Sequence, residues 1–344
     1  MLSSERLEAI LTSFPRLTIA LVGDLFLDRY LELEPGVHEL SIETGLEAYQ
    51  VTRVRNSPGA LGTVMNNLAA LGVGLLVPVT VIGDDGHGFD LLREVRRLPV
   101  DTTHILSDPR RLTPTYTKPM KQDSAGQWQE LNRLDVRTRG PLRDEATRQL
   151  RERLRLAWHS SDGLIVLDQI NEENWGVVNG SVRDCLAELA REAPKKLMYI
   201  DSRAYLSRFD FGTLKGNRHE VTNAIGLPDE RDEAAAIATQ ALATRTGRAA
   251  FCTAGERGIL VARPNESATL VPGYPAPGPI DIVGAGDAAT SGIVTSLLAG
   301  ATELEAAAVG NLVASITVQQ IGTTGTATPK QVRERWQQSQ KNEH

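Results

Sequence analysis

The chain has 344 residues, of which 41% are hydrophobic and 23% charged, values typical of a globular protein with a sizeable core. The net charge of −6, without a basic stripe bearing interleaved aromatic residues, argues against a nucleic-acid partner. Cys185 and Cys252 are the two cysteines, so we expect neither a disulfide framework nor a thiolate metal site, and we expect a reducing cytoplasm. The first ten residues predict an amphipathic helix rather than a signal peptide, and no apolar run reaches membrane-spanning length, so no membrane association is expected.

Short apolar runs alternate with helical patterns through most of the chain. The runs are typical of buried strands and predict strands at residues 17–23, 76–83, 163–168, 197–201 and 249–253. The helical patterns predict helices at residues 58–72, 90–97, 142–157, 175–191 and 233–246. This alternation predicts an α/β fold with three αβα layers and a mostly parallel central sheet. Because no linker or repeat divides the chain, we expect a single domain over residues 1–344.

Two insertions show a different pattern, in which polar and β-branched residues alternate. The pattern covers residues 41–44 and 50–55, and it returns at residues 113–121 and 128–135. It is typical of exposed strands with one covered face. We therefore predict a small β-sheet lid, with strands inserted at residues 31–56 and 112–135. The apolar face of such a sheet needs cover, so we expect a homodimer in which two lids pair.

Acidic residues follow several predicted strands, at the edge where α/β proteins bind ligands. Asp24 and Asp28 follow the first strand, and either carboxylate can accept hydrogen bonds from a polyol. The alternative is a turn or cap role, which we favour for Asp24. Asp168 and Asp201 lie at the ends of later strands.

A Gly-Ala-Gly turn leads directly into an apolar helix near the C-terminal end of the chain. The main-chain N–H groups of Gly284, Ala285 and Gly286 should collect at the helix N-terminus, where a phosphate is favoured. Asp287 follows at once, and a carboxylate beside a phosphate suits a base that takes the proton from an attacking hydroxyl. The alternative is that Asp287 caps the helix and the glycines only turn the chain.

Two further loops follow predicted strands. Asn217 and Glu220 lie three residues apart on one side of a turn and can share the water shell of Mg²⁺. The alternative is a solvated loop with a helix-capping glutamate. Residues 253–258 contain two glycines that allow a flat or anionic ligand to approach, although a hairpin turn explains them equally well. The histidines lack metal-ligand spacing, so we expect no zinc site.

These residues, in this order, resemble the ribokinase-like (PfkB) family of carbohydrate kinases over residues 17–329. Asp281-Ile-Val-Gly-Ala-Gly-Asp287 is close to the family's C-terminal signature D-T-x-G-A-G-D, and residues 58–72 are similar to its N-terminal Gly-Gly signature. Residues 22–30 and 132–135 look most like the heptose-phosphate kinase half of bacterial ADP-heptose synthesis proteins. We do not expect the nucleotidyltransferase half of those proteins here.

The resemblance implies an ATP-dependent kinase that transfers the γ-phosphoryl group to a hydroxyl of a sugar or sugar phosphate. It makes Asp287 the base and Gly284, Ala285 and Gly286 the anion hole. The residues that it places around ATP and Mg²⁺ are Asn217, Glu220, Thr253, Gly255, Gly258 and Asn311, with Glu220 reaching the metal through water. Those that it places around the acceptor are Asp28, Gly59, Thr63 and Asp281. It also implies a monovalent cation such as K⁺ near Asp281, and dimerisation through the lid.

Several positions depart from the family pattern and leave the acceptor open. Gly59-Ala60 replaces Gly-Gly, and Thr63 replaces an asparagine that offers both a donor and an acceptor. Ile282 replaces the usual threonine. A catalytically impaired, ligand-binding relative and a nucleoside kinase are therefore the alternative functions.

Basic residues in or near the predicted lid and cleft are candidates to hold a phosphosugar. They are Arg53, Arg55, Lys118, Lys121 and Arg203. The alternative is that they form a solvated charged face.

Overall fold

The computed structural model describes residues 2–123, 125–228, 231–322 and 324–342. Nine strands of this described part form the main sheet, in the order β14-β13-β12-β11-β10-β9-β1-β4-β5. They are β1 (Thr18–Gly23), β4 (Leu75–Gly83), β5 (Ile105–Asp108), β9 (Gly163–Asp168), β10 (Leu197–Ser202), β11 (Thr213–Asn217), β12 (Ala250–Thr253), β13 (Gly258–Ala262) and β14 (Thr269–Pro272). From β12 to β5 every pairing is parallel, whereas β13 and β14 pair antiparallel at one edge. The predicted mostly parallel sheet is confirmed.

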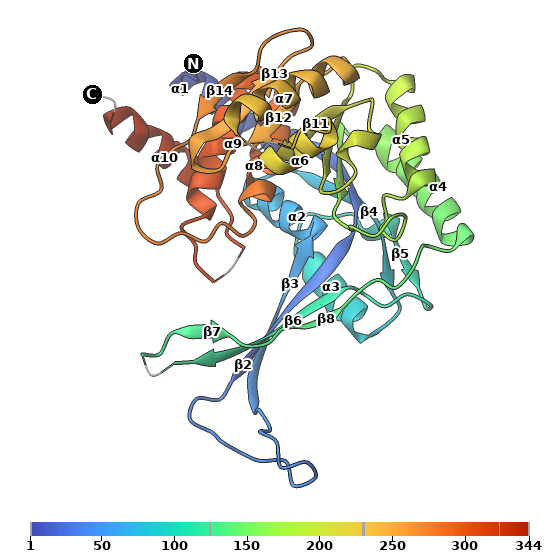
Figure 1. The fold of residues 1–344 in the computed structure, drawn as a ribbon, viewed down its shortest axis with the longest axis vertical. Helices are drawn as coiled ribbons and strands as arrows, with labels where there is room; N and C mark the ends of the chain where they lie inside the picture. Colours follow the sequence, from blue (N-terminus) through green and yellow to red (C-terminus); the bar gives the residue numbers. More distant parts are fainter. Residues whose placement is uncertain (1, 124, 229–230, 323, 343–344) are drawn as a thin grey trace.

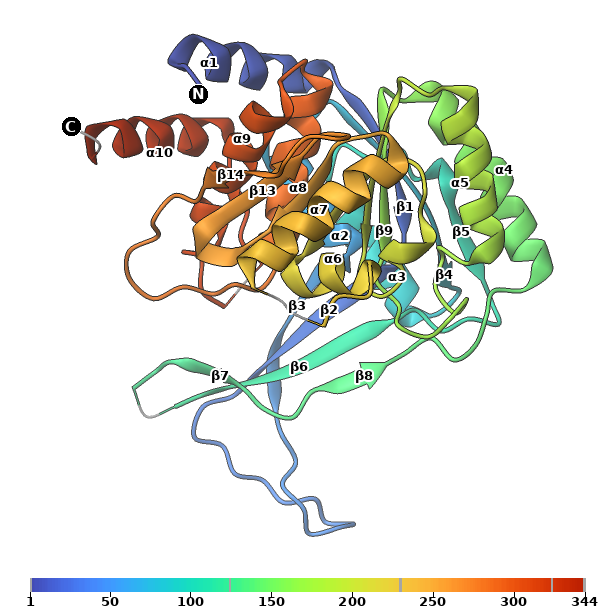
Figure 2. The same ribbon diagram turned by 45° about the horizontal axis from the view of Figure 1, so that its top comes forward.

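Helices cover both faces of this sheet (Figures 1 and 2). One layer contains α4 (Asp144–Ser160), α5 (Gly180–Glu192), α6 (Arg218–Ala224) and α7 (Asp232–Thr246). The other contains α1 (Ser4–Ser13), α2 (Leu61–Ala70), α3 (Gly86–Val95), α8 (Ala285–Leu298), α9 (Glu303–Thr317) and α10 (Pro329–Asn342). A hydrophobic core lies on each face of the sheet, and successive residues of a strand point into opposite cores. In β1, Ile19 and Leu21 face the layer that contains α8, whereas Ala20 and Val22 face the layer that contains α4. The three-layer αβα prediction is therefore confirmed.

Helix α8 is buried because its surface is built from small residues. A Cβ atom on Gly292 would lie 2.9 Å from the Cα atom of Gly310 in α9, so glycine is needed where the two helices cross. Ala288, Ile293 and Val294 of α8 lie in the same core as α2 and α9. This packing fixes the N-terminus of α8 relative to the sheet.

A smaller sheet, which we call the lid, projects beyond one end of the main body (Figure 1). Its strands are β2 (Leu25–Leu33), β3 (Val51–Ala60), β6 (Thr115–Gln122), β7 (Trp128–Glu130) and β8 (Leu134–Val136). Strand β2 pairs antiparallel with β3 and parallel with β6, while β7 and β8 both pair with β6. Because β1 ends at Gly23, the chain passes from the main sheet into the lid at Asp24.

Residues 34–50 join β2 to β3 as a long loop, and the strand predicted at residues 41–44 is wrong. A single isolated bridge between Leu40 and Glu47 is present instead. Gly36 and Gly45 adopt positive φ angles of 77° and 67°, which turn the chain out of an extended path. Alternation alone therefore overestimated the strand content here.

Three helix starts also differ from prediction by three or more residues. Helix α2 begins at Leu61 rather than at residue 58, because β3 extends to Ala60. Side-chain caps explain the other two. Helix α3 begins at Gly86 rather than at residue 90, because the Asp85 carboxylate accepts a hydrogen bond from the Gly88 N–H group. Helix α5 begins at Gly180 rather than at residue 175, because the Asn179 side chain accepts one from Val182. Both cysteines are free and buried. Among the described helices, none combines the length and apolar character that a membrane crossing requires.

Candidate active site

Two cavities meet at the carboxyl ends of the parallel strands. The first, which we call the lid cavity, has a volume of about 650 Å³ and lies between the lid and the main sheet, with Asp28, Thr63, Lys118, Arg133 and Asp281 in its lining. The second, the core cavity, has a volume of about 740 Å³ and is lined by residues of the main body. The residues that line both cavities are Gln169, Arg203, Gly284 and Asp287. Asp287 thus lies on the boundary between two spaces of ligand size.

The N-terminus of α8 forms part of this boundary. Gly284 precedes the helix with a φ of 81°, and Asp287 is the third helical residue, without a side-chain cap. The alternative in which Asp287 caps the helix is therefore wrong. The Ala285 N–H group, expected to face an anion, instead donates to the Ile282 carbonyl at 3.1 Å. Within the described residues, the N–H groups of Gly284, Gly286 and Asp287 have no hydrogen-bond acceptor, so they are the amides that remain for a ligand.

Carboxylates gather around this helix start with one buried lysine. The Lys215 ammonium lies 2.7 Å from Asp201 Oδ2, and both side chains are buried. A Cβ atom on Gly286 would lie 3.3 Å from Lys215 Nζ, so the ammonium reaches the start of α8. Burial opposes the charge of Lys215, but Asp201 and Glu220 outweigh it and raise the pKa of Lys215. Lys215 therefore carries a positive charge beside the unpaired amides.

Burial and neighbouring acids shift the pKa of the site carboxylates upward. Burial, followed by the charge of Asp201, raises the pKa of Asp287 to about 7. The same two causes raise the pKa of Glu220. A carboxyl group with a pKa near neutrality is suited to general-base chemistry.

The residues predicted on the nucleotide side all line the core cavity: Asn217, Glu220, Thr253, Gly255, Gly258 and Asn311. Asn217 and Glu220 also form a capping box at α6, with hydrogen bonds of 2.9 and 2.7 Å. The helix-capping glutamate of the alternative is therefore confirmed, and the Mg²⁺ role stays a prediction. The hairpin alternative holds for residues 253–258, because β12 and β13 pair antiparallel. The Asn311 amide donates to the carbonyls of Val271 and Pro272, which ties α9 to β14.

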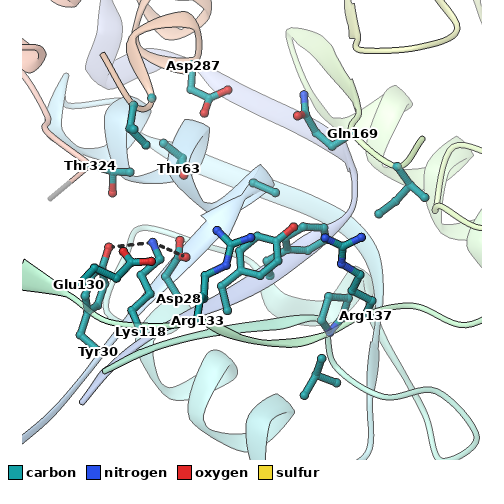
Figure 3. Close-up of a pocket in the computed structure, with 18 of the residues that line it drawn as sticks. Asp28, Tyr30, Thr63, Lys118, Glu130, Arg133, Arg137, Gln169, Asp287 and Thr324 are labelled. Atoms are coloured by element: carbon teal, nitrogen blue, oxygen red, sulfur yellow. Dashed lines mark hydrogen bonds and ion pairs between the residues drawn. The ribbon is translucent and has the colours of Figure 1, made fainter. Parts of the chain in front are cut away.

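The residues predicted on the acceptor side are less uniform. Asp28 faces the lid cavity and lies 3.1 Å from Lys118, which also donates to the Tyr30 hydroxyl (Figure 3). Gly59 does not line the cavity: a Cβ atom there would lie 2.4 Å from Asp28 Oδ2, so this glycine makes room for the carboxylate.

Thr63 and Asp281 line the lid cavity, and Asp281 Oδ1 accepts a hydrogen bond from Val283. Asp24 lies outside both cavities. It accepts a hydrogen bond from Val177 and lies 3.6 Å from Arg111, so the carboxylate joins distant segments and is not the turn or cap residue that we favoured.

Comparison with known proteins agrees with this arrangement. Residues 208–331, which include the start of α8, match the model of the pfkB family carbohydrate kinases. The bifunctional protein HldE of Caulobacter sp. (strain K31) is 30% identical over 314 residues, which are 90% of this chain and 61% of HldE. Part of the chain thus matches the pfkB family of carbohydrate kinases, and most of it is similar to HldE. It spans about three fifths of the length of the curated relatives that it matches.

Solved structures of two kinases share the fold across nearly the whole chain. Ribokinase from Arabidopsis thaliana, complexed with ribose and ATP, superposes with a TM-score of 0.65 at 18% identity and covers 93% of this chain and 98% of its own. Phosphofructokinase-2 from Escherichia coli, in complex with fructose-6-phosphate, gives 0.68 at 16% identity and covers 94% and 99%. The predicted ribokinase-like fold is confirmed.

The structure places only some of the predicted basic residues in the lid cavity. Lys118 and Arg203 line the lid cavity, but Arg53 and Arg55 pair with Glu32, and Lys121 pairs with Glu47, outside it. No sequence pattern identified Lys215, Gln169, Arg133 or Arg137 as a candidate, although Gln169 lines both cavities and the other three line one of them. Lys215 precedes Asn217 by two residues in the same short motif, a signal that was available.

Ala60 occupies the position where the family signature has its second glycine. Its backbone conformation is strained for a residue with a side chain. Its φ of 51° and ψ of −112° lie outside the regions favoured by residues with a Cβ atom. We expect Ala60→Gly to stabilise the protein by about 1 kcal/mol, because relief of strain exceeds the entropy that glycine loses on folding. Thermal unfolding tests this. The matched change Ala69→Gly inside α2 should lower the melting temperature. If Ala60→Gly lowered the melting temperature by the same amount, the strain argument would be contradicted.

Proposed function

We propose that this chain is an ATP-dependent kinase that transfers the γ-phosphoryl group of ATP to a hydroxyl of a sugar or sugar phosphate. The observation that carries the proposal is the position of Asp287, whose side chain lies in the shared wall of the lid cavity and the core cavity. A group transfer needs two ligands whose reacting atoms meet at one point. In this arrangement the acceptor occupies the lid cavity, ATP occupies the core cavity, and they meet at Asp287.

The chain's own residues have distinct tasks in this transfer. The Asp287 carboxylate takes the proton from the acceptor hydroxyl as the oxygen attacks phosphorus. The N–H groups of Gly286 and Asp287, together with the Lys215 ammonium, stabilise the charge on the transferred phosphoryl group. Arg203 lines both cavities, which suits a cation that contacts the phosphoryl group as it passes between them.

The donor set on the core side fits Mg²⁺ bound mainly through water and ATP oxygens. Asp201, Glu220 and Asp287 give this region three carboxylates against Lys215 and Arg203, an excess of negative charge that a cation offsets. Among the described residues, no group of three or more potential ligands is placed to enclose a metal ion. Mg²⁺ commonly keeps several waters, and when bound it would neutralise charge on the phosphates. Glu220 is the residue that would hold it. The monovalent cation beside Asp281 stays a prediction.

The lining of the lid cavity supports a hydroxylated, charged acceptor. Asp28 can accept hydrogen bonds from hydroxyl groups, and Lys118, Arg133 and Arg137 bring positive charge into the same cavity (Figure 3). Two of the solved relatives were crystallised with ribose or fructose-6-phosphate, which supports a carbohydrate acceptor. Phe26 and Tyr116 are the aromatic residues besides Tyr30 in this lining, and they pack edge to face with their ring centroids 5.4 Å apart.

The apolar residues exposed on the lid support the proposed homodimer. Val51 and Val54 of β3, Trp128 of β7 and Leu134 of β8 are all exposed in the single chain. Pairing of two lids would cover them. Light scattering tests this, and a monomer at micromolar concentration would contradict it.

The experiment that tests the function is a screen for ADP release over a panel of acceptors, with a parallel thermal-shift scan. The panel contains hexoses, ribose, ketohexose phosphates, heptose phosphates and adenosine. Acceptor-dependent ADP release is expected with a sugar or a sugar phosphate. Thermal stabilisation without ADP release for every acceptor would instead support the catalytically impaired relative.

Activity should depend on pH through Asp287. The pKa of about 7 means that Asp287 is mostly protonated below neutrality and cannot then accept a proton. We expect kcat/KM for the acceptor to fall about tenfold per pH unit below pH 7 and to level off above it, because kcat/KM reports the enzyme form that meets the substrate. A profile that is flat between pH 5.5 and pH 8 would contradict this role.

A further inference from the structure

A further cavity of about 220 Å³ lies at the root of the lid, between residues 108–112 and 137–143. We call it the lid-root pocket. Five of its eleven lining residues are arginines: Arg110, Arg111, Arg137, Arg139 and Arg143. Asp108 is the one acidic residue in this lining. Such a concentration of guanidinium groups around one small space is unfavourable unless negative charge offsets it.

Three of these arginines have acidic partners. Arg143 makes two hydrogen bonds to the Asp108 carboxylate, of 2.7 and 3.1 Å. Arg111 lies 3.6 Å from Asp24, and Arg137 lies 3.5 Å from Asp135. Arg110 and Arg139 are solvent-exposed, and within the described residues neither forms an ion pair like those of the other three arginines. The rim of the pocket therefore carries two guanidinium groups that water solvates and that an anion can contact.

The walls of the pocket are held in place by the fold. The Asp108 carboxylate accepts the Arg110 N–H group at 3.0 Å in addition to the Arg143 side chain. The Arg111 guanidinium is buried and donates to Thr138 Oγ1 at 3.2 Å and to the Trp175 carbonyl at 3.4 Å. The two segments are thus tied together through Asp108 and Arg111, so little ordering is needed when a ligand binds.

We propose that the lid-root pocket binds a small phosphate-bearing anion at a site that adjoins the lid cavity through Arg137 and Thr138 but does not include Asp287. A phosphomonoester carries between one and two negative charges near neutral pH, which matches the two unpaired guanidinium groups better than a single carboxylate does. Guanidinium groups also suit phosphate oxygens geometrically. The volume lies below the range of about 300–1,000 Å³ typical of drug-sized ligands, so the pocket takes the phosphate group and leaves the rest of the ligand outside.

The position of the pocket connects it to the lid. Arg111 lies four residues before β6, and Thr138 lies two residues after β8, so both flank lid strands. Arg111 is also paired with Asp24, the residue between β1 and β2. A bound anion would therefore touch the side chains that anchor the lid to the main body. Asp287 and the α8 N-terminus are not part of its lining.

The test is calorimetric titration of the full chain with inorganic phosphate at low ionic strength, because salt screens such an interaction. The double variant Arg110→Gln/Arg139→Gln should bind phosphate about tenfold or more weakly than the wild type at this site, through the loss of charge-assisted hydrogen bonds. Arg148→Gln removes one charge from α4, where Arg148 pairs with Glu145 and Glu152, and serves as the matched control. Circular dichroism melting confirms folding, and Arg139→Gln alone is the milder variant should the double variant unfold.

The titration must distinguish phosphate that binds at the N-terminus of α8 from phosphate that binds in the lid-root pocket. Lys215→Gln weakens the α8 site alone, so it should retain the binding event that the double variant loses. Hydrogen exchange should show phosphate-dependent protection at residues 108–112 and 137–143. The lid-root site is refuted if the double variant binds phosphate like the wild type, or if protection is confined to residues 284–290. A Lys215→Gln variant that binds phosphate at α8 normally would count against the proposed function alone.

Discussion

Replacing Asp287 with asparagine should lower kcat by roughly 10²–10⁴-fold, the usual cost of losing a well-placed general base. Asparagine keeps the size of the side chain but cannot take a proton from the acceptor hydroxyl. ATP affinity should change little, because the Gly286 and Asp287 N–H groups and Lys215 remain. Steady-state ADP release measures kcat, and calorimetry with a non-hydrolysable ATP analogue measures binding.

Two controls separate this chemical effect from damage to the fold. Asp162→Asn makes the same change at the amino end of β9, away from the carboxyl ends of the strands, and should keep kcat near normal. There Asp162 accepts a hydrogen bond from the Thr18 N–H group. The folded-state pKa of Asp287, about 7, lies above its unfolded value of 3.8, so this carboxyl group makes folding less favourable as pH rises from about 4 to about 7. Asp287→Asn should therefore melt at a higher temperature than the wild type at pH 8. Near-normal turnover in a folded Asp287→Asn variant would contradict the role of Asp287.

Lys215→Met should lower both turnover and stability. Its removal leaves Asp201 buried without a counter-charge, which typically costs about 3–5 kcal/mol. It also removes the positive charge next to Gly286, and losing one such stabilising group costs roughly 10²–10³-fold in kcat. Denaturant unfolding and ADP release measure the two effects.

A second variant separates the two roles of Lys215. In Lys215→Met/Asp201→Asn the unpaired carboxylate is gone, so stability should recover in part while turnover stays low. Lys196→Met removes a lysine that donates to the Trp158 carbonyl at the far end of β10, and should keep its turnover. If the double variant regains turnover together with stability, the role of Lys215 is structural only.

The sequence predicted the start of α8 well because its signal is local. A turn with two glycines directly before an apolar helix determines where the N–H groups of Gly286 and Asp287 lie, and Asp287 follows within the same motif. The strands of the main sheet were similarly accessible, since buried parallel strands appear as short apolar runs.

The residues that were missed or misplaced depend on contacts between distant segments. Lys215 reaches Asp201 because β10 and β11 are neighbours in the sheet, an order that no local pattern reveals. Arg53 and Arg55 were candidates for phosphate binding, but β2 places Glu32 opposite Arg53 and close to both. Gly59 matched a sugar-contacting position, yet it makes room for Asp28 on the paired strand. Charge and spacing identified the residue types, and strand pairing decided which of them face the cleft.

The most direct test of the account is to follow the label of γ-³²P-ATP in a single turnover with the acceptor found by the ADP-release screen. The account predicts that the label appears in the phosphorylated sugar at the rate at which ADP forms, and that both processes slow together in Asp287→Asn. Label found only in inorganic phosphate, or transfer to the sugar that proceeds unchanged without the Asp287 carboxylate, would contradict it.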